Sequence, residues 1–295
     1  MSKQNAKNMT PALMKAWPLP DPAAKPEPGA EGKEARGRVL VVGGGCRCPG
    51  SVELSAVAAL RAGAGKLQMA AASDAALHLA LSVPEARVMG LRCDSRGEIA
   101  QSSADVDACA KQADAVVVGP GMEVAPATRQ LADHLMHVSR ALFVLDAGGL
   151  DATLIGRLGR TRGPRGVIMT PHHGEMAQML DLDVAEVDAR PMELAIEFAQ
   201  HSGVVLVLKG RETYVATPEG EAWVNREGSV GLGTSGSGDV LSGVIAGLAA
   251  RGATPAQAAA WGVWLHARAG AALEKKMGPL GYLAREIAAE IPALM

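Results

Sequence analysis

Short apolar runs alternate with helical patterns along most of this chain, and this alternation constrains its fold more than any other feature. The expected strands lie within residues 38–42, 66–71, 113–121, 141–149, 166–175 and 204–210. Helical patterns lie between them at residues 52–65, 74–82, 125–139 and 193–203. Apolar strands that alternate with helices predict a mostly parallel sheet that is covered on both faces. The fold class is therefore α/β.

Three regions of the chain do not follow this alternation: a segment after the last expected parallel strand, the C-terminal third and the N-terminus. Residues 213–225 have the pattern of a hairpin with its turn at Pro218–Gly220. The last third predicts helices at residues 239–251, 255–275 and 282–291. Residues 1–36 are rich in proline and lack periodicity, so we expect a Pro-rich N-terminal arm there and a single domain over residues 37–295.

Composition excludes several classes of function. The formal net charge is −2 and aromatic residues make up 3% of the chain, which argues against a nucleic-acid or membrane-surface partner. No transmembrane span or signal peptide is evident, so we expect a cytoplasmic protein. Cys46 and Cys48 lack the second ligand pair of a zinc site, and all four cysteines are expected to be ordinary reduced thiols.

Ligands of an open parallel sheet bind at the carboxyl ends of its strands. Several polar or glycine-rich segments are expected at that edge: the loop after Val42, Gly119–Pro120–Gly121, Asp146, Pro171–Glu175, Lys209–Gly210 and residues 231–248. Because these segments follow predicted strands or lead into helices, their side chains converge on one predicted site.

The segment "TSGSGD" is the most informative of them. Gly236, Ser237 and Gly238 bring bare backbone N–H groups to the start of a helix near Val240, which predicts an anion hole. Asp239 is either an N-cap of that helix or a catalytic base, and the flanking small residues favour the second interpretation. A carboxylate beside an anion hole accepts a proton from a hydroxyl that attacks a phosphoryl group. The segment is neither a Walker A loop nor a Rossmann fingerprint.

Three further motifs carry candidate residues. In "TPHHGE", His172 is the better candidate for a ligand contact, His173 is expected in a solvated loop, and Glu175 favours the N-terminus of the next helix. Lys209 ends an apolar strand and needs an anionic partner, for which a phosphate is suitable. His266 has helical spacing among alanines and leucines, which favours a structural role in packing or in an interface.

Five ordered motifs resemble the ADP-dependent NAD(P)H-hydrate dehydratases of the ribokinase-like superfamily. The motifs are "AALRAGAG", "VVVGPGM", "TPHHGEMAQML", "VLKGRETYVATPEG" and "GSGDVLSGVIAGLAARG", and the resemblance covers about residues 36–293. It implies a three-layer α/β/α fold with a central, mostly parallel sheet. It also implies a repair reaction, in which the C6 hydroxyl of the S epimer of hydrated NADH or NADPH is phosphorylated by ADP and then lost as phosphate. The separate epimerase domain of some relatives is not expected here.

The resemblance also implies roles for individual residues. Asp239 matches the base and contacts the substrate together with Ser51, Gly121 and His172. The nucleotide is expected at Lys209, Gly210, Arg211, Glu212, Thr213 and Gly238. Mg²⁺ is expected with the phosphates, but its ligands cannot be assigned from the sequence. Relatives form tetramers, so a homo-oligomer is expected, and the Ala-rich helix near residues 255–274 is a candidate interface.

The chain departs from the family pattern at four positions. Ser51 replaces an alanine, His173 a proline, Ser235 a glycine and Ser229 an asparagine. These changes affect the surroundings of the substrate and leave the base in place. Two alternatives stay open from the residues alone: a small-molecule kinase of the same superfamily, which acts on a sugar or vitamin alcohol, and a nucleotide sensor without turnover.

Overall fold

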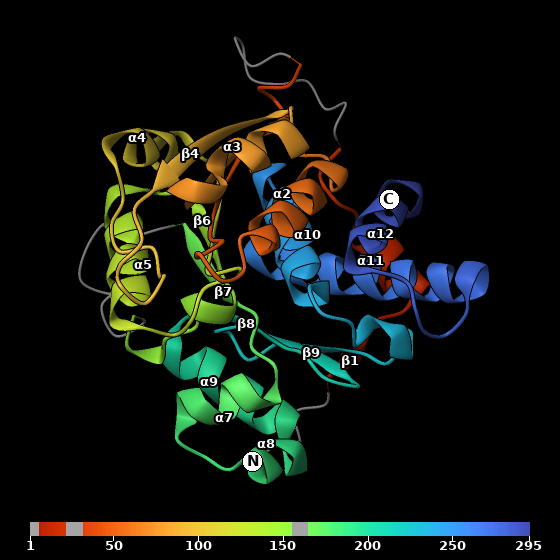
Figure 1. Cartoon of the computed structure of the whole chain (residues 1–295). Helices are drawn as coiled ribbons and strands as arrows, with labels where there is room; N and C mark the ends of the chain where they lie inside the picture. The colour runs from red at the N-terminus through yellow and green to blue at the C-terminus, as the bar shows by residue number, and fades with distance from the viewer. Residues whose placement is uncertain (1–5, 22–31, 155–164) are drawn as a thin grey trace.

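Ten strands of the described residues form one sheet in the order β1-β10-β9-β8-β7-β6-β5-β2-β3-β4 (Figure 1). The computed structural model describes residues 6–21, 32–154 and 165–295. The strands are β1 (Lys7–Asn8), β2 (Arg38–Val42), β3 (Lys66–Ala72), β4 (Ala86–Leu91), β5 (Ala115–Val118), β6 (Leu142–Leu145), β7 (Gly166–Met169), β8 (Val205–Leu208), β9 (Thr213–Ala216) and β10 (Ala222–Asn225).

The sheet is mostly parallel, as predicted. Only β9 runs antiparallel to its neighbours β8 and β10, whereas β1 runs parallel to β10 at the described edge. The predicted hairpin is confirmed, with Ala216 opposite Ala222 in the register. Gly220 closes its turn, because its N–H donates to the Thr217 carbonyl at 2.9 Å. The carboxyl ends of β2, β5, β6, β7 and β8 therefore lie along one edge of the sheet.

Helices cover both faces, and successive strand residues alternate between two cores. Val39 and Val41 of β2 join the core under α2 and α10, whereas Leu40 and Val42 join the core under α4 and α5. The first face also carries α11 and α12, and the second carries α9 (Figure 1). The main helices are α2 (Gly50–Arg61), α3 (Ser73–Ser82), α4 (Ala104–Gln112), α5 (Pro126–Val138), α7 (His173–Leu180), α8 (Val184–Ala189), α9 (Pro191–Ser202), α10 (Ser237–Ala250), α11 (Pro255–Met277) and α12 (Ala284–Glu290).

Two glycines of α10 let this helix lie directly on α2. A Cβ atom at Gly243 would be 2.0 Å from the carbonyl oxygen of Ser55, and one at Gly247 would be 2.4 Å from that of Ala59. Any side chain at these positions would push the helices apart. The close approach brings the N-terminal turn of α10 next to the start of α2, where Ser51 lies.

Beyond the N-terminal segment, one strand and three α-helices of the described residues were not predicted from the sequence. β4 is an edge strand in which Arg87 and Gly90 are exposed, and these two residues of "ARVMGL" weaken the pattern of a buried strand. α4 has few apolar residues, and Val106, Cys109 and Ala110 are its buried positions. α7 and α8 are short helices within what was expected to be a loop and its continuation.

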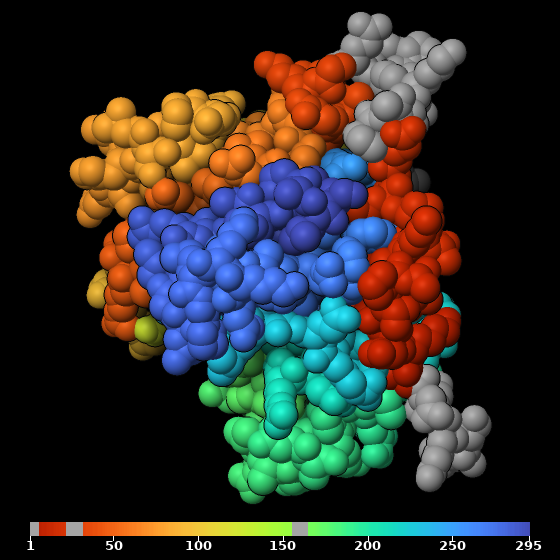
Figure 2. All heavy atoms as spheres, turned by 90° about the vertical axis from the view of Figure 1, so that its right-hand side faces the viewer, coloured from red at the N-terminus to blue at the C-terminus, as the bar shows by residue number. Residues whose placement is uncertain are grey.

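The N-terminal segment packs against the domain in its described part, and part of it is helical. Residues Pro11–Ala16 form α1, and Met9 and Met14 are each 1% exposed. Trp17 stacks on Trp223 of β10 with ring centroids 5.2 Å apart, and its carbonyl accepts from Trp261 Nε1 at 2.7 Å. Figure 2 shows this segment, in red, lying against the cyan and blue parts of the chain.

The Ala-rich helix α11 is buried largely inside its own chain. Ala258, Ala259 and Ala260 are 0% exposed and belong to the core that includes α10. Its buried alanines are therefore not available to a second subunit, and a subunit interface on the rest of this helix stays a prediction. Among the described helices, none is long and apolar enough to cross a membrane.

Candidate active site

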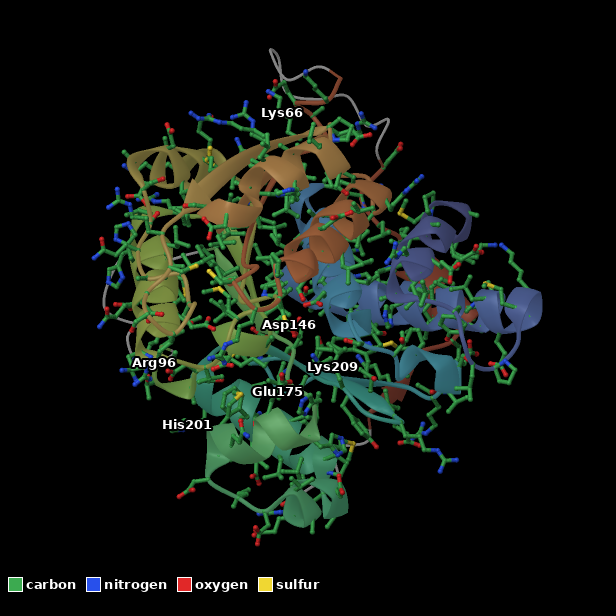
Figure 3. All side chains as sticks on the ribbon, viewed as in Figure 1. Lys66, Arg96, Asp146, Glu175, His201 and Lys209 are labelled. Atoms are coloured by element: carbon green, nitrogen blue, oxygen red, sulfur yellow. The ribbon has the colours of Figure 1, made fainter. Side chains whose placement is uncertain are left out.

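Lys209 lies at the centre of the strand-end edge, with carboxylates on two sides. Its Nζ is 2.9 Å from Asp146 Oδ1, at the end of β6, and 3.8 Å from Glu175 Oε2, on α7. Figure 3 shows the three side chains gathered near the middle of the molecule, above α7, whereas Lys66 and Arg96 lie at its periphery. Burial disfavours the ammonium, but the carboxylates of Asp146 and Glu175 outweigh it and raise the pKa of Lys209. Lys209 therefore carries a fixed positive charge.

Asp146 lies at the buried end of this cluster and is 2% exposed. The Thr170 hydroxyl donates to its Oδ1 at 2.7 Å, and the Lys209 ammonium donates to the same oxygen. The sequence marked Asp146 as a strand-end residue without assigning it a role. Its position after β6, beside the ends of β7 and β8, is the signal that connects it to the site.

Asp239 lies in the first turn of α10 and is not its N-cap. The N-cap is Gly236, with φ of +85°, and the helix begins at Ser237. A side chain at position 236 would be strained by this φ and would also meet Leu54, since its Cβ would lie 2.5 Å from Leu54 Cδ1. The capping interpretation of Asp239 is therefore wrong, and the carboxylate faces the cluster instead.

The surroundings of Asp239 raise the pKa of its carboxyl toward neutral pH. Burial raises the pKa of its carboxyl to about 7, and the charge of Asp146 acts in the same direction. A hydrogen bond from the Ser51 hydroxyl and the charge of Lys209 act in the opposite direction. A carboxylate with this pKa exchanges a proton readily near pH 7.

Two of the residues predicted to contact the substrate with Asp239, Ser51 and Gly121, lie on its α2 side, whereas His172 does not. Ser51, in the first turn of α2, bonds to the Asp239 carboxylate. Gly121 lies against the same turn, because a Cβ atom there would be 2.8 Å from Ser51 Cβ and 2.3 Å from the Cys48 carbonyl oxygen. Ser51, Gly121 and Asp239 are therefore brought together.

His172 is the N-cap of α7, at the opposite side of the cluster. Its Nδ1 accepts from the Glu175 N–H at 3.1 Å, and its own N–H donates to Glu175 Oε2 at 2.7 Å, which completes a capping box. The side chain of His172 is 58% exposed, and its Nε2 lies 3.7 Å from Glu175 Oε2. Glu175 serves the helix start, as predicted, and also contacts Lys209.

A cleft of about 920 Å³ opens beside Lys209 and the N-terminus of α10. Of the residues predicted to hold the nucleotide, Lys209, Gly210, Arg211, Thr213 and Gly238 line it, together with His172 and Ser237. Glu212 does not, because its carboxylate accepts from Tyr214 at 2.6 Å and from Arg226 Nε at 2.9 Å.

Other residues of the cleft wall were not predicted from the sequence. They are Asn225, Arg226, Glu227, Gly228, Ser229, Val230, Leu232, Gly233, Thr234, Leu241, Val263, His266 and Ala267. The apolar members come from α10, α11 and the segment that follows β10. Helical and loop patterns gave no signal that these residues face one cleft, because the cleft forms only when α11 packs across α10.

The departures from the family pattern fall on both sides of the site. His173 is not in a solvated loop as expected, since its Nδ1 bonds to Asp188 Oδ1 at 2.5 Å and its Nε2 lies 2.7 Å from the Cβ position of Gly210. Ser229 lines the cleft, and its hydroxyl accepts from the Gly231 N–H at 3.2 Å. Ser235 is exposed.

The described residues contain no group of three or more His, Cys, Asp or Glu side chains arranged to hold a metal by themselves. Asp146 and Glu175 nevertheless offer carboxylate oxygens around one ammonium, and Asp239 adds a third carboxyl nearby. This excess of acidic groups suits a Mg²⁺ ion that arrives on nucleotide phosphates and needs only one or two protein carboxylates.

Comparisons with known proteins agree on one family. A family model described as NAD(P)H-hydrate dehydratase matches residues 39–293. The ADP-dependent (S)-NAD(P)H-hydrate dehydratase of Xanthomonas campestris pv. campestris is 45% identical over 295 residues, which is 100% of this chain and 98% of that protein. The bifunctional NAD(P)H-hydrate repair enzyme of Moorella thermoacetica is 35% identical over 88% of this chain and 49% of that protein. The Bacillus subtilis ADP/ATP-dependent NAD(P)H-hydrate dehydratase, co-crystallised with ATP and Mg²⁺, has a TM-score of 0.77 and 28% identity, covering 92% of this chain and 94% of that one.

Proposed function

The chain belongs to the NAD(P)H-hydrate dehydratase family, and we propose that it restores hydrated NADH and NADPH by ADP-dependent dehydration. The observation that carries this proposal is the carboxyl of Asp239, with a pKa of about 7, in the first turn of a helix whose N-terminus faces a nucleotide-sized cleft. The products are NAD(P)H, AMP and phosphate. The similarity to a full-length ADP-dependent dehydratase supports this reaction.

In the proposed first step, Asp239 accepts the proton of the C6 hydroxyl of the S epimer as this oxygen attacks the β-phosphorus of ADP. The bond between that phosphorus and the AMP oxygen breaks, and AMP leaves. Ser51, Gly121 and His172 hold the hydrated ring beside the base. The contact between Ser51 and Asp239 supports this arrangement, because it brings a predicted substrate residue to the carboxylate.

The negative charge of the transferring phosphoryl group needs stabilisation. The backbone N–H groups of Gly236 and Gly238 and the dipole of α10 supply it, together with the Lys209 ammonium. The Ser237 N–H, which was expected to be a third donor, instead donates to the Thr234 carbonyl at 3.2 Å. Lys209 Nζ lies 3.3 Å from the position of a Cβ at Gly238, so the ammonium and the helix terminus act on the same volume. Gly210, Arg211, Glu212 and Thr213 hold the rest of the nucleotide, with Glu212 acting through its bond to Arg226.

The second step, elimination of the phosphate, needs fewer groups of the protein than the phosphorylation. The lone pair of the ring nitrogen expels the phosphate from C6, and loss of a proton from the neighbouring carbon restores the double bond. The phosphate leaves into the same anion hole. Phosphorylation is therefore the step on which the residues of the site act most directly.

Asp146 and Glu175 would hold a Mg²⁺ ion that is bound to the nucleotide phosphates. When bound, this ion neutralises charge on the phosphates. The Bacillus relative co-crystallised with ATP and Mg²⁺ supports its presence. We further propose that the chain works in the cytoplasm as a homotetramer, and light scattering in solution tests the assembly.

An absorbance assay tests the function. Hydrated NADH with ADP should recover absorbance at 340 nm on addition of the protein, and ATP in place of ADP tests the choice of donor. No recovery with either donor would overturn the proposal. A stable phosphate ester of a sugar or vitamin alcohol would instead identify the small-molecule kinase, and ADP binding without any turnover would identify the nucleotide sensor.

A further inference from the structure

His266 of α11 lies under the first turn of α10, at the wall of the nucleotide cleft. It is 9% exposed. Its Nε2 is 3.1 Å from the Ser237 hydroxyl oxygen and 3.0 Å from the Ser237 carbonyl oxygen. Both residues line the cleft together with Lys209 and Gly238. The histidine is therefore placed to act on one residue of the anion hole.

The carbonyl oxygen of Ser237 determines which nitrogen of His266 carries the proton. A carbonyl oxygen only accepts hydrogen bonds, so Nε2 must carry the hydrogen that it donates. Burial lowers the pKa of His266 to about 4, and the ring is neutral near pH 7 with a single N–H. The tautomer is thus the Nε2–H form.

With this tautomer, the Ser237 hydroxyl cannot donate its hydrogen to His266. A protonated Nε2 cannot accept the hydroxyl proton, and the hydroxyl has no other hydrogen-bond partner within the described ranges. Its hydrogen is therefore free to point into the cleft. The oxygen of a nucleotide phosphate is an acceptor suited to that position, and a hydrogen bond to a charged oxygen is stronger than one to a neutral group.

We propose that His266 is a positioning residue, which fixes the first turn of α10 through the Ser237 carbonyl and leaves the Ser237 hydroxyl to donate to a nucleotide phosphate. The inference rests on the proposed function, since it places ADP in this cleft. It assigns a role to a histidine whose spacing alone favoured simple packing. A packing role and a positioning role differ in how His266 and Ser237 depend on each other.

A double-mutant cycle measured by calorimetry with ADP separates the two roles. His266→Leu and Ser237→Ala should each weaken ADP binding about tenfold, which is the effect expected for loss of a hydrogen bond to a charged group. If His266 acts through Ser237, the double variant should bind no more weakly than either single variant. His266→Gln keeps an N–H donor and should bind ADP within about twofold of wild type. The KM for hydrated NADH should not change in any of these variants.

Additive losses in the cycle, or equal losses in the Gln and Leu variants, would overturn the inference. Nitrogen-15 NMR of the wild-type histidines provides a test that needs no variant, because it distinguishes Nε2–H from Nδ1–H. The Nε2–H form of His266 is expected, and the Nδ1–H form would overturn the inference. A wild-type protein that binds no ADP would overturn the proposed function instead, while the NMR result still tests His266.

Discussion

The Lys209 ammonium and the Asp146 carboxylate are 2.9 Å apart, and their side chains are 19% and 2% exposed. They come from β8 and β6, on either side of β7, so the sheet itself fixes their separation. Because Lys209 also approaches Gly238, this pair connects the floor of the site to the first turn of α10. The stability of the pair and the binding of phosphate are therefore linked.

Lys209→Met should lower both stability and ADP affinity, because it leaves the buried Asp146 carboxylate unpaired. Breaking a buried ion pair in this way costs about 3 kcal/mol of unfolding free energy. Lys66→Met is the matched control, since Lys66 pairs with Glu34 near the surface and such pairs contribute about 1 kcal/mol or less. Urea unfolding measures both variants. Equal losses in the two would contradict the assignment of Lys209 and Asp146 as a buried pair.

Asp239→Asn should abolish ADP-driven recovery of 340 nm absorbance, because an amide cannot accept the hydroxyl proton. ADP binding should remain largely intact, since the N–H groups of α10 and the Lys209 ammonium are unchanged. Rate assays and calorimetry on the same preparation measure the two properties. Full activity in this variant would rule out Asp239 as the base.

The same substitution should change how stability depends on pH. The folded-state pKa of Asp239, about 7, is above the usual aspartate value of 3.8, so the folded protein favours the protonated form. The contribution of Asp239 to stability is therefore fully present below about pH 4 and is lost as pH rises through 7. Asp239→Asn should exceed the stability of wild type by roughly 2 kcal/mol at pH 8 and match it at low pH. Thermal unfolding at several pH values measures this difference, and a constant offset would contradict it.

Ser51→Ala should move the acid limb of the pH–rate profile to higher pH. The Ser51 hydroxyl stabilises the ionised Asp239, and its removal raises the pKa of that carboxyl. Between pH 9, where the base is ionised in both proteins, and pH 6, we expect the kcat/KM of the variant relative to wild type to fall by about threefold, on top of any loss that does not depend on pH and reflects the substrate contact. Ser55→Ala, a buried serine of the same helix that contacts Ser242, is the control and should leave the limb in place. A limb that does not move in Ser51→Ala would show that the hydroxyl does not tune the base.

Much of the fold could be predicted because most strands and helices have a recognisable local pattern of apolar residues. The apolar runs around Val41, Val117 and Leu206 are buried on both faces and are easily recognised. By contrast, β4 is an exposed edge and α4 is a polar helix, so their patterns are weak. An exposed edge strand and a polar helix were therefore among the elements that the sequence did not reveal.

The residues of the candidate site also fall into those with a local sequence pattern and those without one. Asp239 and Lys209 stood out because a charged residue at the end of a glycine-rich or apolar segment is unusual locally. Asp146 belongs to the site because it pairs with Lys209, which is 63 positions away in the sequence. His266 belongs to it because its ring nitrogen contacts Ser237, which is 29 positions away. Such pairs depend on how strands and helices pack, and no local pattern contains that information.

Gly236 and Gly238, two residues apart at the start of α10, should respond differently to the same substitution. Gly238→Ala puts a Cβ 3.3 Å from Lys209 Nζ, at the edge of the phosphate volume, so ADP binding should weaken by about tenfold with little loss of stability. Gly236→Ala puts a Cβ 2.5 Å from Leu54 Cδ1 on a residue with φ of +85°, so it should lower the unfolding free energy by about 2 kcal/mol. Calorimetry with ADP and urea unfolding separate the two effects. If both variants lost mainly stability, Gly238 would be a packing position and the anion hole would lose one of its predicted members.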